Sequence, residues 1–334
     1  MQTSHSRLRR VAFHAFAAFS ALLTAVATAS AVDSPIDLAA LAANPLEMAK
    51  SYTKEVSVKD YKGTRKVLIS MAAVTFKLES NAFTKATDVL GGMHTGTAST
   101  AMTMSLGGVS KEALQQIADA FHDQLAAEFK ALGAEVIDTS VVKASPKFAA
   151  LAAMNDESHR QAHVNKNYNG QKATLITLTG YGMPLVGTGL SGIGGPARTM
   201  MALGMDFGEN VTVVYANVTV DFVSMSGSGG LLAKSSSVSG KPLLNVPFVT
   251  ACGFFRGYYG GAVGFTKPII SLVDYSTAVT ESSNVRNTDW FSGSTASRSA
   301  YVVQADEAKY KAAVGDMLKA VSVMFTARIR EKAK

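Results

Sequence analysis

Cysteine is almost absent from this chain, since Cys252 is the only one among 334 residues. A single thiol excludes an intramolecular disulfide, and no cysteine stands near the N-terminus to carry a lipid anchor. The neighbours of Cys252 are apolar residues or glycine, which predicts a buried and unreactive thiol. An exported protein without disulfides must be stabilised by its core. Hydrophobic residues make up 47% of the chain, which is enough to build one.

Acidic residues are missing from the N-terminal segment, where the basic residues Arg7, Arg9 and Arg10 precede an apolar run at 11–26. Alanines spaced as Ala-x-Ala follow this run, as at a signal-peptidase site. The order of the three zones predicts a cleavable signal peptide over residues 1–31 and therefore an exported protein. An uncleaved membrane anchor is the alternative, but the apolar run is shorter than the ~20 residues that a spanning helix needs.

The net charge excludes a typical nucleic-acid-binding protein. Removing the three arginines of the predicted signal lowers the basic count from 32 to 29, against 25 acidic residues, and leaves +4. The basic residues are scattered and form no stripe with aromatic residues between them.

Motifs of the common enzyme classes are also missing. The chain has no Walker A motif, EF-hand, CxxC pair or nucleophile elbow. The segment 187–192 matches G-x-G-x-x-G, but it does not directly follow a predicted strand, so we interpret it as a glycine loop rather than a dinucleotide site. The sequence therefore predicts no catalytic residue and no cofactor. An exported hydrolase or ligand-binding protein that uses the glycine-rich segment 180–195 is retained as an alternative function.

Two histidines, His159 and His163, are weak candidates for a metal site. Their spacing of four would place them on one face of a helix, and acidic residues lie nearby. The segment lacks the glutamate of H-E-x-x-H and contains Arg160, which disfavours a bound cation. A solvated surface is the simpler interpretation, so no metal is assigned.

The hydrophobic pattern predicts a single α/β or α+β domain over 66–334, after an N-terminal tether at 32–65. It has glycine-rich insertions at 180–195 and 226–265. We expect a mixed sheet flanked by two long amphipathic helices. The predicted strands are 66–78, 134–142, 173–179, 210–224 and 267–280, and the predicted helices are 110–132, 145–154 and 305–332. The segments 80–109, 156–172 and 282–300 are expected to be polar loops.

Two of these elements carry specific positional predictions. Ser110 is expected to cap the N-terminus of the first long helix, and Gly133 to follow its C-terminus. His122, between the core positions of this helix, is expected at the surface. In the segment 210–224 the residues alternate between two faces, one of which carries Val214, Ala216, Val218, Val220 and Phe222.

The order of the framework resembles that of the curli-secretion-channel (CsgG-like) family and related periplasmic domains. The resemblance rests on KVLISMAAVTF, LQQIADAFHDQLAAEFKALGAEVIDTSVV, SPKFAALAAM, ENVTVVYANVTVDFVS and PIISLVDYSTAVTESS. It covers most of 66–142 and 205–332, while 156–208 has no counterpart. The chain departs from the family in lacking a lipidation cysteine and in having Ala278 where a turn glycine is expected.

This resemblance implies a secretion-related fold, with 226–265 and 282–300 standing where channel members insert membrane-spanning β-hairpins. The first insertion is apolar and aromatic, whereas the second is short and polar. Four membrane strands of ~9–11 alternating residues would be needed, and the sequence pattern does not reveal four.

The function predicted from the sequence is a non-enzymatic envelope protein, periplasmic or at the outer membrane. It would act in secretion or surface assembly by contact with other envelope or secretion proteins, or with copies of itself. An outer-membrane pore-forming oligomer is a further alternative. The predicted contact or membrane surface is the segment 246–265, and a buried sheet core is the competing interpretation of the same segment. Its aromatic residues are Phe254, Phe255, Tyr258, Tyr259 and Phe265.

The two Ala-x-Ala sites predict the start of the mature protein. We expect N-terminal sequencing of the protein from the cell envelope to begin at Ser30 or Val32. A sequence that begins at Met1 would contradict a cleaved signal.

Overall fold

The computed structural model describes residues 35–333, except 91–92, 169–170, 187–193, 209, 229, 232–234, 248–249, 258, 290–291 and 293. Its helices are α2 (Leu38–Ala43), α3 (Pro45–Tyr52), α4 (Lys111–Ala131), α5 (Thr139–Lys143), α6 (Phe148–Ala152), α7 (Gly194–Asp206) and α8 (Glu307–Ala333). Three 3-10 turns accompany them, η1 (Val58–Tyr61), η2 (Glu157–Arg160) and η3 (Gly180–Gly182).

The strands form one large mixed sheet with the order β1-β11-β10-β7-β2-β3-β14-β13 along its main path. They are β1 (Thr53–Val56), β2 (Lys66–Leu90), β3 (Met93–Gly107), β4 (Glu135–Val136), β5 (His163–Tyr168), β6 (Gln171–Thr179), β7 (Val211–Ser228), β8 (Gly230–Leu231), β9 (Ser237–Val246), β10 (Ala251–Arg256), β11 (Tyr259–Phe265), β12 (Ile269–Ser271), β13 (Ser276–Asp289) and β14 (Ser294–Ala305). The pairs β2–β7 and β3–β14 are parallel, whereas β2–β3 and β13–β14 are antiparallel. The predicted α/β architecture with a mixed sheet is thus confirmed.

The ends of α4 lie where the sequence places them. The side chain of Ser110 accepts a hydrogen bond from the backbone N–H of Ala113 at 3.1 Å, which satisfies one of the free donors of the first turn. After the last turn, Gly133 adopts a φ of +84°, a left-handed conformation that costs glycine little. Both capping predictions are confirmed.

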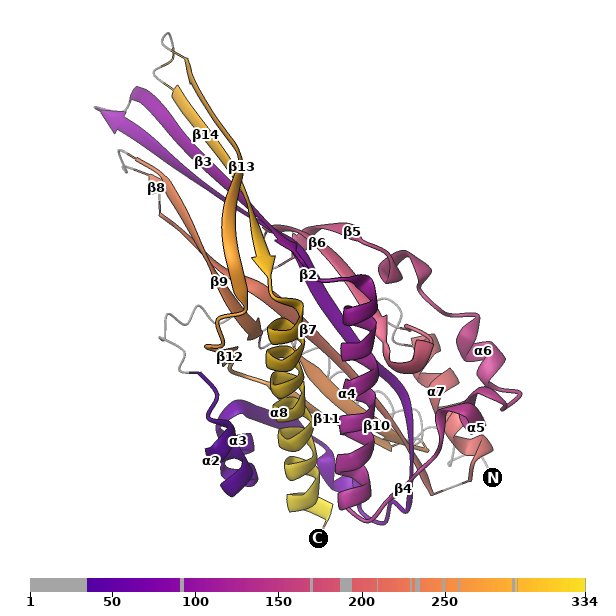
Figure 1. The fold of residues 1–334 in the computed structure, drawn as a ribbon. Helices are drawn as coiled ribbons and strands as arrows, with labels where there is room; N and C mark the ends of the chain where they lie inside the picture. The colour runs from indigo at the N-terminus through magenta and orange to yellow at the C-terminus, as the bar shows by residue number, and fades with distance from the viewer. Residues whose placement is uncertain are drawn as a thin grey trace.

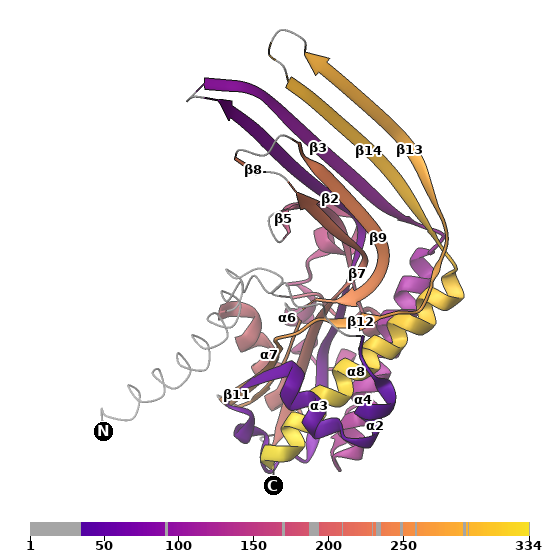
Figure 2. The same cartoon turned by 90° about the vertical axis from the view of Figure 1, so that its left-hand side faces the viewer.

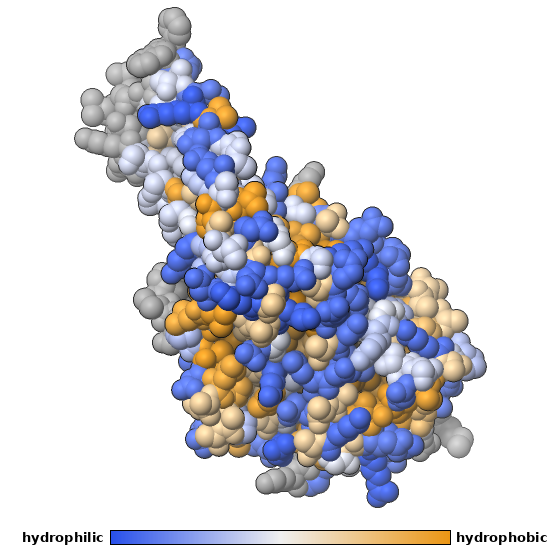
Figure 3. Space-filling model, viewed as in Figure 1, coloured by the Kyte–Doolittle hydropathy of each residue, from blue (hydrophilic) through white to orange (hydrophobic). Residues whose placement is uncertain are grey.

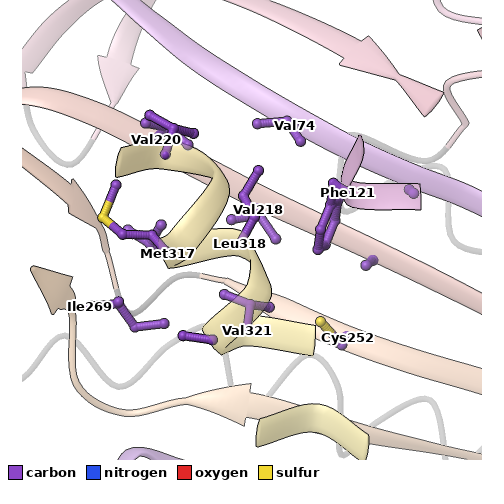
Figure 4. Packing of buried hydrophobic residues seen from close by; sticks show 14 of the residues in the cluster. Val74, Phe121, Val218, Val220, Cys252, Ile269, Met317, Leu318 and Val321 are labelled. Carbon is purple, nitrogen blue, oxygen red and sulfur yellow. The ribbon is translucent and has the colours of Figure 1, made fainter. Parts of the chain in front are cut away.

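The main core lies between the sheet and the pair α4 and α8, which lie side by side in front of it (Figure 1). Figure 4 shows Met317, Leu318 and Val321 of α8 pointing toward Val218 and Val220 of β7. The apolar stripe of α8 is buried along its length, with Tyr310, Val314, Met317, Leu318, Val321, Phe325 and Ile329 all 1% exposed or less. The helical period of the sequence therefore marks the side of α8 that faces the core.

A second core cluster lies on the opposite face of the sheet, where α5, α6 and α7 pack. Val211 and Val213 of β7 belong to this cluster, whereas Val214, Ala216 and Val218 belong to the first. The predicted alternation of β7 is confirmed, and both of its faces are buried over this stretch.

Four long strands leave this body and project beyond the helices (Figures 1 and 2). We call them the arm and define it as residues 79–90 of β2 together with β3, β14 and β13. With 25 residues at about 3.3 Å per residue, β2 spans roughly 80 Å, so it serves both the core and the arm.

Several segments differ from their predicted structure. The segments 80–109 and 282–300, which the sequence predicts as loops, contribute to long strand pairs instead, because Thr, Ser and Ala extend readily once neighbouring strands satisfy their backbone groups. The predicted strand at 134–142 is short, and α5 begins within it because the Asp138 carboxylate accepts a hydrogen bond from the N–H of Ser140 at 2.8 Å. Within the predicted insertion at 226–265, β10 and β11 are paired strands of the main sheet.

None of the helices in the described part of the chain combines the length and the apolar character that crossing a membrane requires.

The burial of Phe254 and the exposure of Phe83, which is 64% exposed, provide a matched pair of substitutions. We expect Phe254→Ala to lower the free energy of unfolding by about 3–5 kcal/mol, because it leaves a cavity in the main core. Phe83→Ala should change it by no more than about 0.5 kcal/mol. Urea denaturation of both variants measures this difference, and equal losses would contradict the assignment of Phe254 to the core.

Candidate interaction surface

The arm consists of two β-hairpins that lie side by side. In the first, β2 and β3 pair from Glu79 opposite Ser105 to Leu90 opposite Met93. In the second, β13 and β14 pair from Ser276 to Asp289. The hairpins join because β14 runs parallel to β3. The structure therefore contains the four long strands that the sequence pattern did not reveal.

One face of the arm, its inner face, is covered by the strand pair β7–β9. The Thr84 hydroxyl donates a hydrogen bond to the carbonyl of Ser237 at 3.2 Å, and the Thr100 hydroxyl donates one to the carbonyl of Ser236 at 3.0 Å. Met104 lies on the same face and is only 1% exposed. Short hydroxyl side chains thus let the second layer approach closely, and they satisfy its backbone carbonyls.

The side chains on the opposite face of the arm, its outer face, are mainly small and polar. Directly paired residues of neighbouring strands share a face, so the strand register defines rows across the arm. The central rows are Lys85–Ser99–Ala296–Asn287, Phe83–Ala101–Arg298–Val285 and Asn81–Thr103–Ala300–Ser283. Phe83 and Val285 are the only larger apolar residues in these rows. In the view of Figure 3 the arm is mostly blue or pale, as this composition requires.

The strand at one margin of the arm, β13, is the most exposed strand in the described part of the protein. Every residue from Thr277 to Asp289 is exposed, so both faces of β13 meet solvent. It ends the strand order, and β14 is its neighbour in the sheet. One row of its backbone N–H and C=O groups therefore has no strand partner among the described residues.

A second free edge lies on the other side of the arm. On this side of β2, Glu79 and Ser80 pair with β6, and Ala86 pairs with β8. The segment 81–85 between them has no described strand beside it. The arm thus offers two different strand edges on opposite margins.

The aromatic residues predicted as a contact surface lie elsewhere, in the body. Phe254 is fully buried and packs edge-on against Tyr61 with ring centroids 5.6 Å apart, and Phe265 is 4% exposed. These two residues therefore belong to the buried core of the sheet, which was the alternative interpretation of this segment, and not to a contact surface. Phe255 is half-buried and stacks on Tyr215 at 5.2 Å.

Two aromatic residues of the predicted contact surface remain. Tyr259 is the first residue of β11. Tyr258 lies outside the described residues.

The two weak metal candidates are brought together. His159 lies in η2, shortly before β5, which begins at His163. The centroids of the two rings are 4.3 Å apart. A turn followed by a strand, rather than the helix that their spacing suggested, brings the rings together. Among the described residues, no group of three His, Cys, Asp or Glu side chains is arranged to hold a metal ion.

A third histidine, His122, is buried rather than exposed as predicted. Gly180 makes this possible, because a Cβ atom there would lie 2.5 Å from the Cβ of His122, so only glycine lets η3 close over α4. Tyr181 follows with a φ of +53° and donates a hydrogen bond from its hydroxyl to Asp123 at 2.7 Å. Periodicity alone could not reveal this burial, because it depends on a segment more than fifty residues away.

The surroundings of His122 do not form a catalytic relay. Its Nε2 lies 3.4 Å from the Thr139 hydroxyl and its Nδ1 3.6 Å from the Asp123 carboxylate, and both distances exceed those of normal hydrogen bonds. Burial lowers the pKa of His122, and the nearby Asp123 opposes that shift. Burial likewise raises the pKa of the fully buried Cys252, which makes it a poor nucleophile. The predicted burial of this cysteine is confirmed.

Searches against protein-family models, curated proteins and solved structures found no match to this chain. The resemblance to the curli-secretion-channel family therefore stays a prediction, and the surface must be judged from its own geometry. One signal for the arm was present in the sequence. In residues 102–105 methionine alternates with threonine and serine, which is compatible with a strand.

The buried His122 predicts a measurable effect of pH on stability. The unfolded chain takes up a proton below the ordinary pKa of about 6.5, whereas the folded protein resists protonation there. We expect the free energy of unfolding to fall as the pH drops below 6.5, by up to about 1.4 kcal/mol per pH unit from this group. In His122→Gln this fall should be smaller, whereas His94→Gln, a control in the arm, should retain it. Urea denaturation between pH 7.5 and 5 tests this, and identical slopes in the wild type and His122→Gln would contradict it.

Proposed function

We propose that this chain is an exported, non-enzymatic protein of the cell envelope, located in the periplasm or at the outer membrane. It takes part in secretion or surface assembly through contact with other proteins. In this proposal the signal peptide is removed, and a single domain, a mixed sheet flanked by the long amphipathic helices α4 and α8, holds the arm. The observation that carries the proposal is the long strand β13, exposed on both faces and without a strand partner along one edge in the described part of the chain.

A free strand edge is a surface for strand addition, because its backbone groups bind an extended partner through main-chain hydrogen bonds. Proteins that avoid such contacts usually place lysine or proline on their edge strands. From Ser276 to Asp289 the sequence STAVTESSNVRNTD contains neither. Its charges, Glu281, Arg286 and Asp289, are of both signs, so they select a partner by charge rather than repel all partners.

A second copy of the chain is the partner that the arm itself supports. The two free edges, β13 and the segment 81–85 of β2, lie on opposite margins, so one copy can present β13 to the β2 edge of the next. Such a head-to-tail contact is heterologous and produces a ring or a filament. The polar outer face supports assembly in water, where Ser, Thr and Asn keep their hydration.

A second candidate is an outer-membrane pore-forming oligomer. Two adjacent hairpins per chain favour it, since they supply four long strands. Strands that face lipid present an apolar band about 25 Å tall, and the central rows of the outer face contain mainly Ser, Thr, Asn and Ala. This composition favours the first candidate. The pore would require an oligomer that forms in detergent and not in aqueous solution.

Cross-linking between copies tests the proposed contact. We expect a mixture of the single variants Phe83→Cys and Val285→Cys, treated with a short bismaleimide, to give dimers that contain one copy of each variant. A new heterologous contact brings the two edges together, and the native Cys252 is buried and unreactive. The products are measured by denaturing electrophoresis and mass spectrometry, in aqueous buffer and in detergent.

The control mixture replaces Val285→Cys by Glu135→Cys, which lies at β4 on the body. It should give no dimer. Dimers of equal yield in both mixtures would show random collision and contradict the edge contact. Dimers in detergent alone would favour the pore.

A further inference from the structure

Two histidine side chains meet beside the sheet, at the start of the β5–β6 strand pair. His159 lies in η2 and His163 at the start of β5, and their ring planes are inclined by 71° with centroids 4.3 Å apart. This arrangement is independent of the proposed strand contact, so either inference can fail without the other.

Each ring uses its Nδ1 atom in a hydrogen bond to an acceptor. The Nδ1 of His159 lies 2.6 Å from Oδ2 of Asp156, and the Nδ1 of His163 lies 3.1 Å from the carbonyl oxygen of Gln161. A carboxylate and a carbonyl can only accept, so the proton of each neutral ring is on Nδ1. The Nε2 atom of each ring then keeps its lone pair.

This pattern is the one that metal-binding histidines show in proteins. They donate their second ring N–H to a carboxylate or a backbone carbonyl, which holds the ring in place and increases the basicity of the ligating nitrogen. Here both kinds of acceptor are present, Asp156 for one ring and the carbonyl of Gln161 for the other.

The free nitrogen of His163 is also an unexplained group. Its Nε2 atom is buried and has no hydrogen-bond partner within the described structure. A buried polar atom without a partner is unfavourable unless something binds it. A metal ion held by this nitrogen would remove that cost.

We propose that His159 and His163 bind one divalent transition-metal ion of the zinc or copper class through their Nε2 atoms. Imidazole nitrogen suits these ions, whereas magnesium and calcium require oxygen ligands. With the ring centroids 4.3 Å apart, one ion at about 2.1 Å from each Nε2 can bridge the two rings after small shifts that keep both Nδ1 hydrogen bonds. Because the described residues supply no third ligand of this kind, water or a group from another molecule completes the coordination.

The sequence position of Arg160 suggested that its charge would disfavour a bound cation. In the structure its guanidinium is engaged elsewhere. The guanidinium of Arg160 donates hydrogen bonds to the hydroxyl of Thr179 at 3.0 Å and to the carbonyl of Met183 at 3.1 Å. Arg160 thus ties η2 to the end of β6. An ion at the histidine pair would tie η2 to β5 as well, so binding should stabilise this margin of the sheet.

Metal titration of the untagged mature protein tests the site. At pH 7.5 we expect ZnCl₂ and CuSO₄ to bind with one ion per chain in calorimetry, copper more tightly, and MgCl₂ not to bind. His163→Ala should weaken zinc binding at least tenfold and abolish the rise in Tm that zinc produces in the wild type. Asp156→Asn keeps the size of the side chain but weakens its hold on His159, and should reduce affinity about 10–100-fold.

His94→Ala is the matched control, because it removes one histidine from the arm and should leave zinc affinity and Tm unchanged. Circular dichroism of each variant verifies the fold, and His163→Gln serves if His163→Ala does not fold. Absence of zinc and copper binding to the wild type would overturn the proposal. Binding that persists unchanged in both His163 variants would also overturn it, since the ion would then lie elsewhere.

Discussion

The strands β2 and β7 run parallel from Lys66 opposite Val211 to Phe76 opposite Val220, and apolar side chains are buried on both faces of this pair. On one face lie α4 and α8, and on the other lie α5, α6 and α7. Water cannot compete for the backbone hydrogen bonds of this ladder, and the apolar side chains on both faces hold it in place. The arm extends from β2, so its direction follows from the core.

The junction between body and arm contains a buried ion pair. Lys77 of β2 and Asp221 of β7 lie 2.7 Å apart, immediately after the last buried apolar pair of the ladder. Burial raises the pKa of Asp221, and the ammonium of Lys77 opposes that rise. Nearby, the hydroxyl of Tyr275 donates a hydrogen bond to the carbonyl of Phe222. A buried pair of this kind tolerates few alternative registers, so it helps to fix where the arm begins.

The two proposed sites differ in how they depend on this frame. The free edge of β13 exists because the sheet continues outward through β3 and β14 without a helix to cover its last strand. The histidine pair exists because Asp156 and the carbonyl of Gln161 orient two rings at the opposite margin. The first is a surface of backbone groups and the second is a pair of side chains, so they select different partners.

The elements with strong local signals could be predicted from the sequence. The stripe of α8, the caps of α4 at Ser110 and Gly133, and the alternation of β7 all follow from a period and an end signal within one segment. The arm could not be predicted with the same rules. Its strands contain mainly Thr, Ser, Ala and Asn and bury few large apolar side chains, of which Met104 is one, so hydrophobic periodicity gave only a weak sign of them. Only the pairing with distant strands makes these segments extended.

The sequence by itself determined the α/β class, the core faces of the long elements and the burial of Cys252. The tertiary structure decided the positions that depend on distant contacts. Phe254 lies in the core because β10 pairs between β7 and β11, and His122 is buried because Gly180 closes over it. The pairing of His159 with His163 and the exposed edge of β13 arise in the same way. A residue's chemistry is local, whereas its exposure and its partners depend on which segments the folded chain brings beside it.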